Sequence, residues 1–271
     1  MTKLLEGVED EKNSEIRSMA SRALKGMWGR YILAFIATIA IQSMVSSLVL
    51  SLTNHTFQQT RETIIDYILE YFVFFALTIS LNIMALFLIR QREIHVSDIF
   101  LVYDKRYYVP FLLLNLVNAL VNYLISFVTF LPHLVVGGMN QYLDLVLNVN
   151  SRITVDWSLF RSSISFIISF LISVVLFLFV SQIISGLFQF AIYVRYDHPE
   201  MTTLQAIKEA WHLMKNHIGQ YILLQISLLG WMVLGLFAFV IGLFWALAYA
   251  NTANAAFYQA LIEKENDRVL S

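Results

Sequence analysis

The sequence contains no cysteine, and this absence excludes disulfide bonds, catalytic thiolates and metal sites built on cysteine. Proline is scarce as well: only Pro110, Pro132 and Pro199 occur, so long helices can run without interruption. Charged residues form 14% of the 271-residue chain, against roughly 25% in a typical soluble domain. Hydrophobic residues form 58%, and lipid is the simplest partner for that apolar excess.

Several function classes lack their signature in this sequence. The net charge of −1 provides no basic field to attract nucleic acid. The sequence has no HExxH pattern for zinc, no GxSxG turn for a catalytic serine and no glycine-rich phosphate loop. We therefore expect no enzymatic activity, no cofactor, no metal site and no nucleic-acid partner.

Six apolar runs predict an all-α, polytopic membrane bundle of about six transmembrane helices, because about 20 apolar residues cross the hydrocarbon core as a helix. The runs cover residues 31–52, 68–89, 109–131, 162–194, 220–237 and 242–262. Gly235 and Gly242 flank the expected tight turn between the last two runs. The chain divides into an amphipathic N-terminal segment (1–30), a six-span membrane domain (31–262) with an outer loop at 132–161, and a C-terminal tail (263–271).

The distribution of Lys and Arg predicts how these spans are oriented. The N-terminal segment, every second loop and the C-terminal tail together hold 15 of the 18 basic residues. Basic loops remain in the cytoplasm, so both termini are expected there, and an odd number of spans would break the alternation. The expected location is the plasma membrane, with the lipid bilayer as a partner; the sequence predicts no oligomeric state.

Three stretches, beginning at Ser14, His95 and Thr202, resemble one another. Each starts with an amphipathic segment and continues into an odd-numbered span, so the spans form three hairpins, each preceded by an amphipathic cytoplasmic helix. A tyrosine marks the start of each of these spans, where its polar hydroxyl and apolar ring suit the membrane edge: Tyr31, Tyr107 and Tyr221. A multispan protein with basic inner loops shows similar regularity without a repeat, and both explanations stay open.

The inner segment at 200–218 has the clearest helical pattern. Its apolar residues recur at spacings of three and four, which places them on one face of a helix: Leu204, Ile207, Trp211, Met214 and Ile218. Thr202 followed by Gln205 matches the capping box that begins many helices. We expect the apolar face to lie along the membrane surface or against the bundle.

The predicted spans contain many amides but almost no ionisable residues, apart from Asp66 and Glu70 at the outer start of the second span. The amides are Asn82, Asn115, Asn118, Asn122, Gln182, Gln189, Gln225, Asn251 and Asn254. The three on span three recur at spacings of three and four and form one polar stripe. Such amides either hydrogen-bond neighbouring helices or line a path for a polar ligand, and the sequence favours packing.

Two series of residues carry a resemblance to a known family. The first is Arg22-Ala23-Leu24-Lys25-Gly26 with Trp28-Gly29; the second is Ala206-Ile207-Lys208, Leu213-Met214-Lys215, Gly230-Trp231, Ile241-Gly242, Tyr249, Thr252-Ala253 and Phe257-Tyr258. With these the chain resembles a family of bacterial integral membrane proteins, found mainly in Gram-positive bacteria, whose function is unknown. It departs from the family at Asn216, where members often carry Gly, and at Ala248, where they often carry Pro.

The resemblance implies a bacterial plasma-membrane location and supplies no catalytic residues. The family is distantly similar to the membrane region of some glycerophosphodiester phosphodiesterases, whose soluble catalytic domain this chain lacks, so that activity does not carry over.

Two hypotheses for the function remain. The first is a non-enzymatic protein that binds a peptide, a lipid or a membrane partner complex, in envelope stress or in antimicrobial-peptide export or protection. The second is a small transporter or permease-like component whose polar path is lined by the amides of spans three to six.

Overall fold

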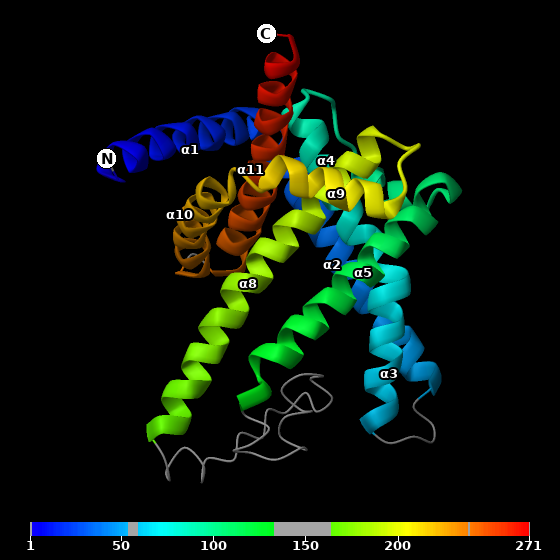
Figure 1. Cartoon of the computed structure of the whole chain (residues 1–271). Helices are drawn as coiled ribbons and strands as arrows, with labels where there is room; N and C mark the ends of the chain where they lie inside the picture. Colours follow the sequence, from blue (N-terminus) through cyan, green and yellow to red (C-terminus); the bar gives the residue numbers. More distant parts are fainter. Residues whose placement is uncertain (1, 54–58, 133–163, 238, 271) are drawn as a thin grey trace.

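The computed structural model describes residues 2–53, 59–132, 164–237 and 239–270, and its regular secondary structure in these ranges is helical throughout (Figure 1). The helices are α1 (Thr2–Leu24), α2 (Trp28–Thr53), α3 (Gln59–Leu69), the π-helix η1 (Glu70–Phe74), α4 (Phe75–Ile89), the 3-10 helix η2 (Val96–Tyr103), α5 (Lys105–Thr129), α8 (Ile164–Asp197), α9 (Thr203–Met214), α10 (Ile218–Phe237) and α11 (Phe239–Leu270). Apart from Pro132, the predicted outer loop at 132–161 lies outside the described residues.

Five segments within the described residues are long and apolar enough to cross a membrane. They are Trp28–Val49, Ile64–Ile89, Lys105–Thr129, Phe170–Asp197 and Ile218–Phe237. These five match the first five predicted spans, and within the described residues the prediction of an all-helical fold with several apolar, membrane-length helices is confirmed. The predicted sixth span, 242–262, forms part of α11 and is not among the five, so the sixth span and the three-hairpin arrangement remain predictions.

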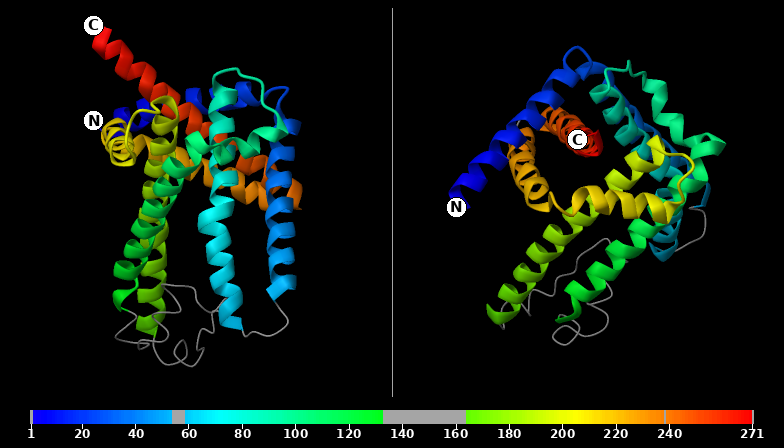
Figure 2. Two further views of the ribbon diagram at one scale, coloured as in Figure 1. Left: turned by 90° about the vertical axis from the view of Figure 1, so that its right-hand side faces the viewer. Right: turned by 45° about the horizontal axis from the view of Figure 1, so that its top comes forward.

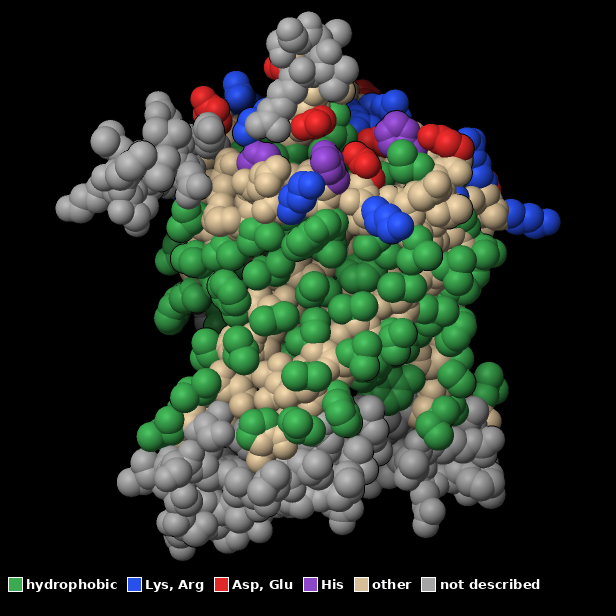
Figure 3. Space-filling model, viewed as in Figure 1, with side chains coloured by type: hydrophobic (Ala, Val, Ile, Leu, Met, Phe, Trp, Pro, Cys, Tyr) green, Lys and Arg blue, Asp and Glu red, His purple; other side chains and the backbone are tan. Residues whose placement is uncertain are grey.

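The two termini lie at the same end of the molecule, together with α1, α9 and η2 (Figures 1 and 2). Charged and histidine side chains gather at this end in the view of Figure 3, above a broad band of hydrophobic side chains. We call it the charged end. Helices α1, η2 and α9 directly precede α2, α5 and α10, so a helical segment at the charged end leads into each of these three long helices.

Helix α4 lies at the centre of the bundle. Its sequence is apolar on every side, as expected of a helix surrounded by others, and most of its side chains are buried. It contacts α1, α2, α5, α8 and α11. Two further pairs pack closely, α5 with α8 and α10 with α11. The left view of Figure 2 shows α5 and α8 side by side, apart from α2 and α3 at the end away from the termini.

Two glycines define the turn between α10 and α11. A Cβ atom on Gly235 would lie 2.6 Å from the carbonyl oxygen of Gly242, so the two backbones approach more closely than any larger residue permits. Helix α10 ends at Phe237 and α11 begins at Phe239, between the two glycines. The predicted position of this turn is therefore confirmed.

Helix α9 begins with the predicted capping box. The Thr202 hydroxyl accepts a hydrogen bond from the backbone N–H of Gln205 over 3.4 Å, and the Gln205 side-chain oxygen accepts one from the backbone N–H of Thr202 over 2.8 Å. The predicted apolar stripe is only partly buried. Its member Met214 is buried together with Ala206, Ala210 and Leu213, whereas Leu204 and Trp211 are 66% and 46% exposed and Ile207 and Ile218 are half-buried. Small alanines allow the helix to approach α8 closely, which leaves the larger side chains on its flank.

Two of the tyrosines expected at the membrane edge are core residues. Tyr31 is fully buried and donates a hydrogen bond to the Leu81 carbonyl over 2.9 Å. Tyr221 is also buried, with its ring 5.8 Å from that of Phe190. Both rings therefore pack against protein, while Tyr107 is half-buried, and the position of the three tyrosines at the membrane edge stays a prediction.

Candidate functional site

A chain of hydrogen-bonded amides crosses the interior of the bundle. Gln182 of α8 donates to Gln225 of α10 over 2.9 Å, and Gln225 donates to Asn254 of α11 over 2.6 Å. Asn254 in turn donates over 3.0 Å to Gln189, which lies on α8 about two turns beyond Gln182. Three apolar helices are thereby joined by side-chain amides.

The same chain continues to α2 and α4. Gln189 donates to Asn251 of α11 over 2.7 Å, and Asn251 donates to the Tyr31 hydroxyl of α2 over 2.7 Å. Tyr31 then donates to the Leu81 carbonyl of α4. Five of the nine predicted amides thus bond to one another, and such pairing satisfies polar groups that apolar surroundings would otherwise penalise.

The polar stripe of α5 makes a second, smaller cluster. Asn122 donates to the side chain of Asn118 over 2.8 Å and accepts from the Ser181 hydroxyl of α8 over 2.9 Å. Asn115 donates to the Tyr71 carbonyl over 3.1 Å. Asn82 makes no side-chain hydrogen bond to the described residues. The structure therefore divides the predicted amides into a linked chain, a cluster on α5, and Asn82.

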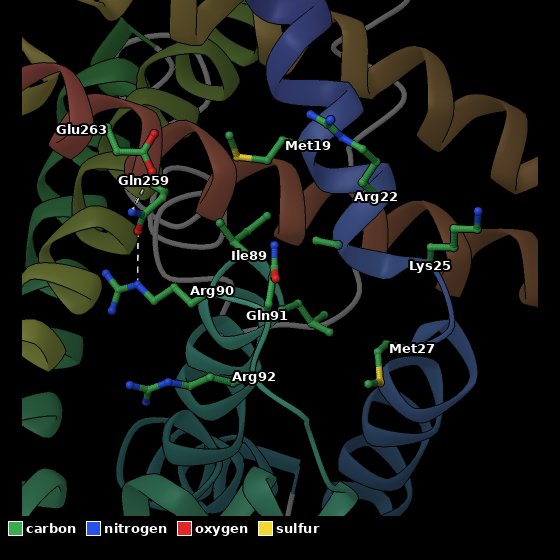
Figure 4. Close-up of a pocket in the computed structure, with 12 residues that line it drawn as sticks. Met19, Arg22, Lys25, Met27, Ile89, Arg90, Gln91, Arg92, Gln259 and Glu263 are labelled. Carbon is green, nitrogen blue, oxygen red and sulfur yellow. Dashed lines mark hydrogen bonds between the residues drawn. The ribbon is translucent and has the colours of Figure 1, made fainter.

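A large pocket at the charged end was missed by sequence reasoning. It has a volume of about 810 Å³ and lies between the ends of α1 and α4 and the C-terminal half of α11 (Figure 4). Its lining residues are Met19, Arg22, Ala23, Lys25, Met27, Leu88, Ile89, Arg90, Gln91, Arg92, Gln259 and Glu263. Four of these are basic and one is acidic. We call this site the basic pocket.

Two turns place the charged side chains of the basic pocket. Helix α1 ends before Gly26, whose φ of +83° is a left-handed conformation that glycine adopts readily. Helix α4 ends at Ile89, and two residues later Gln91 has a φ of +55°, which is left-handed as well. There Arg92 N–H bonds the Phe87 carbonyl over 2.9 Å and Gln91 N–H bonds the Leu88 carbonyl over 3.1 Å, which is the Schellman pattern of a helix C-terminus. This position is usually glycine, so Gln91 holds a costly conformation beside the pocket.

The basic residues of the pocket differ in their partners. The Arg90 guanidinium makes two hydrogen bonds to the Asp197 carboxylate, which raise the pKa of Arg90 above its ordinary value and keep it charged. Arg92 lies over the Phe87 ring at 5.6 Å. No carboxylate of the described residues pairs with Arg22, Lys25 or Arg92. The pocket thus offers three basic side chains without an ion-pair partner among the described residues, and one acidic lining residue, Glu263.

Sequence reasoning counted these cations only as markers of orientation. The available signal was two pairs of closely spaced basic residues, Arg22 with Lys25 in the N-terminal segment and Arg90 with Arg92 directly after the second predicted span. Their meeting depends on how α1 and α4 pack, which local patterns do not reveal. No group of three or more His, Asp or Glu side chains that could hold a metal ion occurs in the part of the chain that the structure describes.

These features define a helical protein that has five helices long and apolar enough to span a membrane, an amide-linked interior and a basic pocket at its charged end. The chain belongs to the family described as "Protein of unknown function (DUF975)", which matches residues 9–265. No curated protein and no solved structure matches the chain. The family match covers nearly the whole sequence and carries no activity with it.

Proposed function

We propose that this chain is a non-enzymatic, multi-pass protein of the bacterial plasma membrane that binds the phosphate of an anionic lipid headgroup in its basic pocket. The observation that carries the proposal is the grouping of Arg22, Lys25 and Arg92 around one pocket, where none of the three forms an ion pair with a carboxylate of the described residues. Basic pockets between helices on the cytoplasmic side of a membrane are suited to phosphate-bearing headgroups.

The position of the pocket favours a lipid over a soluble anion. Its walls are helix ends at the charged end, next to the band of hydrophobic side chains that lipid tails would contact (Figure 3). Met19, Ala23 and Met27 add apolar contacts for the first carbons beyond a headgroup. In the proposed orientation of six spans, with both termini in the cytoplasm, the pocket faces the inner leaflet.

Lipid competition measured by native mass spectrometry tests this proposal. The purified protein is offered phosphatidylglycerol and phosphatidylcholine with identical acyl chains. We expect the wild-type protein to prefer phosphatidylglycerol. The combined change R22Q, K25Q and R92Q should lower that preference about 100-fold, because each basic residue contributes roughly 1 kcal/mol to the attraction of an anionic headgroup.

The matched control neutralises Lys105, Lys208 and Lys215, which are exposed and do not line the pocket. It removes the same charge near the charged end and should retain the preference. Equal losses in the two triple variants would show only a general effect of charge and would contradict a defined site. Inorganic phosphate should not displace the lipid, and strong displacement would assign the pocket to a soluble anion instead.

The cellular setting proposed from the sequence is envelope stress or the export of, or protection against, antimicrobial peptides. Deletion of the gene should then raise sensitivity to a cationic antimicrobial peptide, and only the wild-type chain, not the pocket triple variant, should restore resistance. Unchanged sensitivity after deletion would contradict this setting while leaving lipid binding to the competition experiment. A peptide or a membrane partner complex remains an alternative occupant of the charged end.

A further inference from the structure

A second, smaller cavity lies within the apolar part of the molecule. It has a volume of about 270 Å³ and is bounded by η1, α4, α5, α8 and α11. Its polar lining consists of Glu70, Thr78, Asn82, Asn115, Asn118, Ser185, Gln189 and Asn251, and the remainder is apolar: Phe75, Ile79, Leu114, Phe188 and Ile192. It shares no lining residue with the basic pocket. We call it the amide cleft.

Among the described residues that line the amide cleft, Glu70 alone is ionisable. No hydrogen bond or ion pair joins its carboxylate to the described residues. Glu70 precedes Asn82 by 12 residues, which corresponds to about 18 Å along the helix axis. It precedes Ile89 by 19 residues, or about 29 Å, which is close to the thickness of a hydrocarbon core of roughly 30 Å. The Glu70 carboxylate therefore lies near the boundary of the apolar layer that is opposite the charged end. The amides of the cleft lie further inside that layer.

The backbone at Glu70 is specialised as well. The five residues Glu70–Phe74 form a π-helix, a conformation that is rare and occurs often at functional sites. Three consecutive carbonyls of this segment accept hydrogen bonds from side chains on α5 and η2. The Tyr71 carbonyl accepts from Asn115, the Phe72 carbonyl from Tyr108, and the Val73 carbonyl from Tyr103. These contacts fix the π-helix, and with it the position of Glu70 at the edge of the amide cleft.

From this geometry we propose that the amide cleft binds a small organic ammonium ion, with Glu70 as its counter-ion. A single accessible carboxylate supplies one negative charge, and amide and hydroxyl oxygens supply acceptors for the ammonium hydrogens. Asn115, which bonds the carbonyl of Tyr71 directly after Glu70, places one lining amide at the same end of the cleft. The apolar wall of Phe75, Leu114 and Phe188 suits a short alkyl chain and favours an organic over an inorganic cation.

Saturation-transfer NMR with butylammonium as the probe tests this site. The protein is held in nanodiscs of phosphatidylcholine, and 1-butanol serves as the neutral analogue of the probe. We expect saturable butylammonium binding, weak or absent butanol binding, and about a tenfold loss of affinity in E70Q, as expected for removal of one charge-assisted hydrogen bond.

Asp66 provides the matched control, because it is an exposed carboxylate one turn away and does not line the cleft. D66N should bind butylammonium as the wild type does. Equal affinity for butanol, equal affinity in E70Q, or equal losses in E70Q and D66N would each overturn the proposal. Saturable sodium binding without butylammonium binding would overturn it as well, by assigning the cleft to an inorganic cation. None of these outcomes bears on the basic pocket.

Discussion

The guanidinium of Arg90, directly after α4, donates two parallel hydrogen bonds to the Asp197 carboxylate at the end of α8, over 2.6 and 2.7 Å. Two residues of α11 complete the cluster. Tyr258 donates to the same carboxylate over 3.0 Å, and Gln259 accepts from Arg90 over 3.2 Å. Three helices are therefore fastened together beside the basic pocket, and Arg90 is held as part of its wall.

Changing Asp197 to Asn should lower the free energy of unfolding by about 2–3 kcal/mol. The pair is largely shielded, with side chains 26% and 16% exposed, so removing one charge leaves the other without its partner. Unfolding in mixed detergent micelles measures the change. The control is E93Q, because Glu93 and Arg30 are separated by 3.9 Å and are 73% and 52% exposed, a geometry that contributes little. A comparable loss in both variants would contradict the account of this cluster.

The turn between α1 and α2 depends on glycine. G26A should destabilise the protein by about 1 kcal/mol, because an L-residue pays a conformational penalty at a φ of +83°. G29A should be neutral or stabilising, since Gly29 lies in α2 with open space around its Cβ position. Thermal unfolding of the two variants side by side distinguishes the effects. A G26A variant as stable as G29A would show that the turn imposes no such requirement.

The amide chain should contribute to stability most at its central members. N251L removes side-chain hydrogen bonds to Gln189 and Tyr31 and should cost about 1–2 kcal/mol. Q182L affects an exposed residue at the end of the chain, with one bond to Gln225, and should cost less than half as much. Detergent unfolding of both variants provides the comparison. If Q182L proved as damaging as N251L, the chain would not act as a connected structural element.

The left-handed conformation of Gln91 leads to opposite effects on stability and binding. Q91G should raise the free energy of unfolding by about 0.5–1 kcal/mol, since glycine relieves the strain at a φ of +55°. Because Gln91 lines the basic pocket, the same change should weaken phosphatidylglycerol binding. Thermal unfolding and lipid competition on the same sample test both effects. A variant that loses stability would contradict the assignment of strain.

Much of the fold follows from the sequence because lipid imposes simple rules. Runs of about 20 apolar residues predicted five helices that the structure contains, and the Thr202 capping box and the turn between Gly235 and Gly242 follow from local chemistry. These features depend on neighbouring residues alone. The start of η1 at Glu70 carries no such local signal, because the side chains that support its carbonyls come from distant segments.

The sites were harder to predict because they depend on contacts between distant segments. The nine amides were identified, but nothing local shows that Gln189 bonds Asn251 and Asn254 or that Asn82 borders a cleft. For α9 the sequence left open whether the apolar face packs on protein or lies along the membrane, because apolar periodicity alone does not distinguish the two. In a membrane protein both are apolar, and the size of Ala206 and Ala210 proved more informative.

Photo-crosslinking in living cells tests the central claim, lipid phosphate in the basic pocket, most directly. Benzoylphenylalanine replaces Met19, which lines the pocket, in cells grown with radioactive phosphate. A second variant carries it at Leu204, which is exposed on α9 outside the pocket and samples the surrounding lipid. We predict that the R22Q, K25Q and R92Q changes abolish crosslinking of radioactive phospholipid to the probe that replaces Met19. Crosslinking to the probe that replaces Leu204 should be unchanged. Labelling at Met19 that survives the three changes would contradict the account.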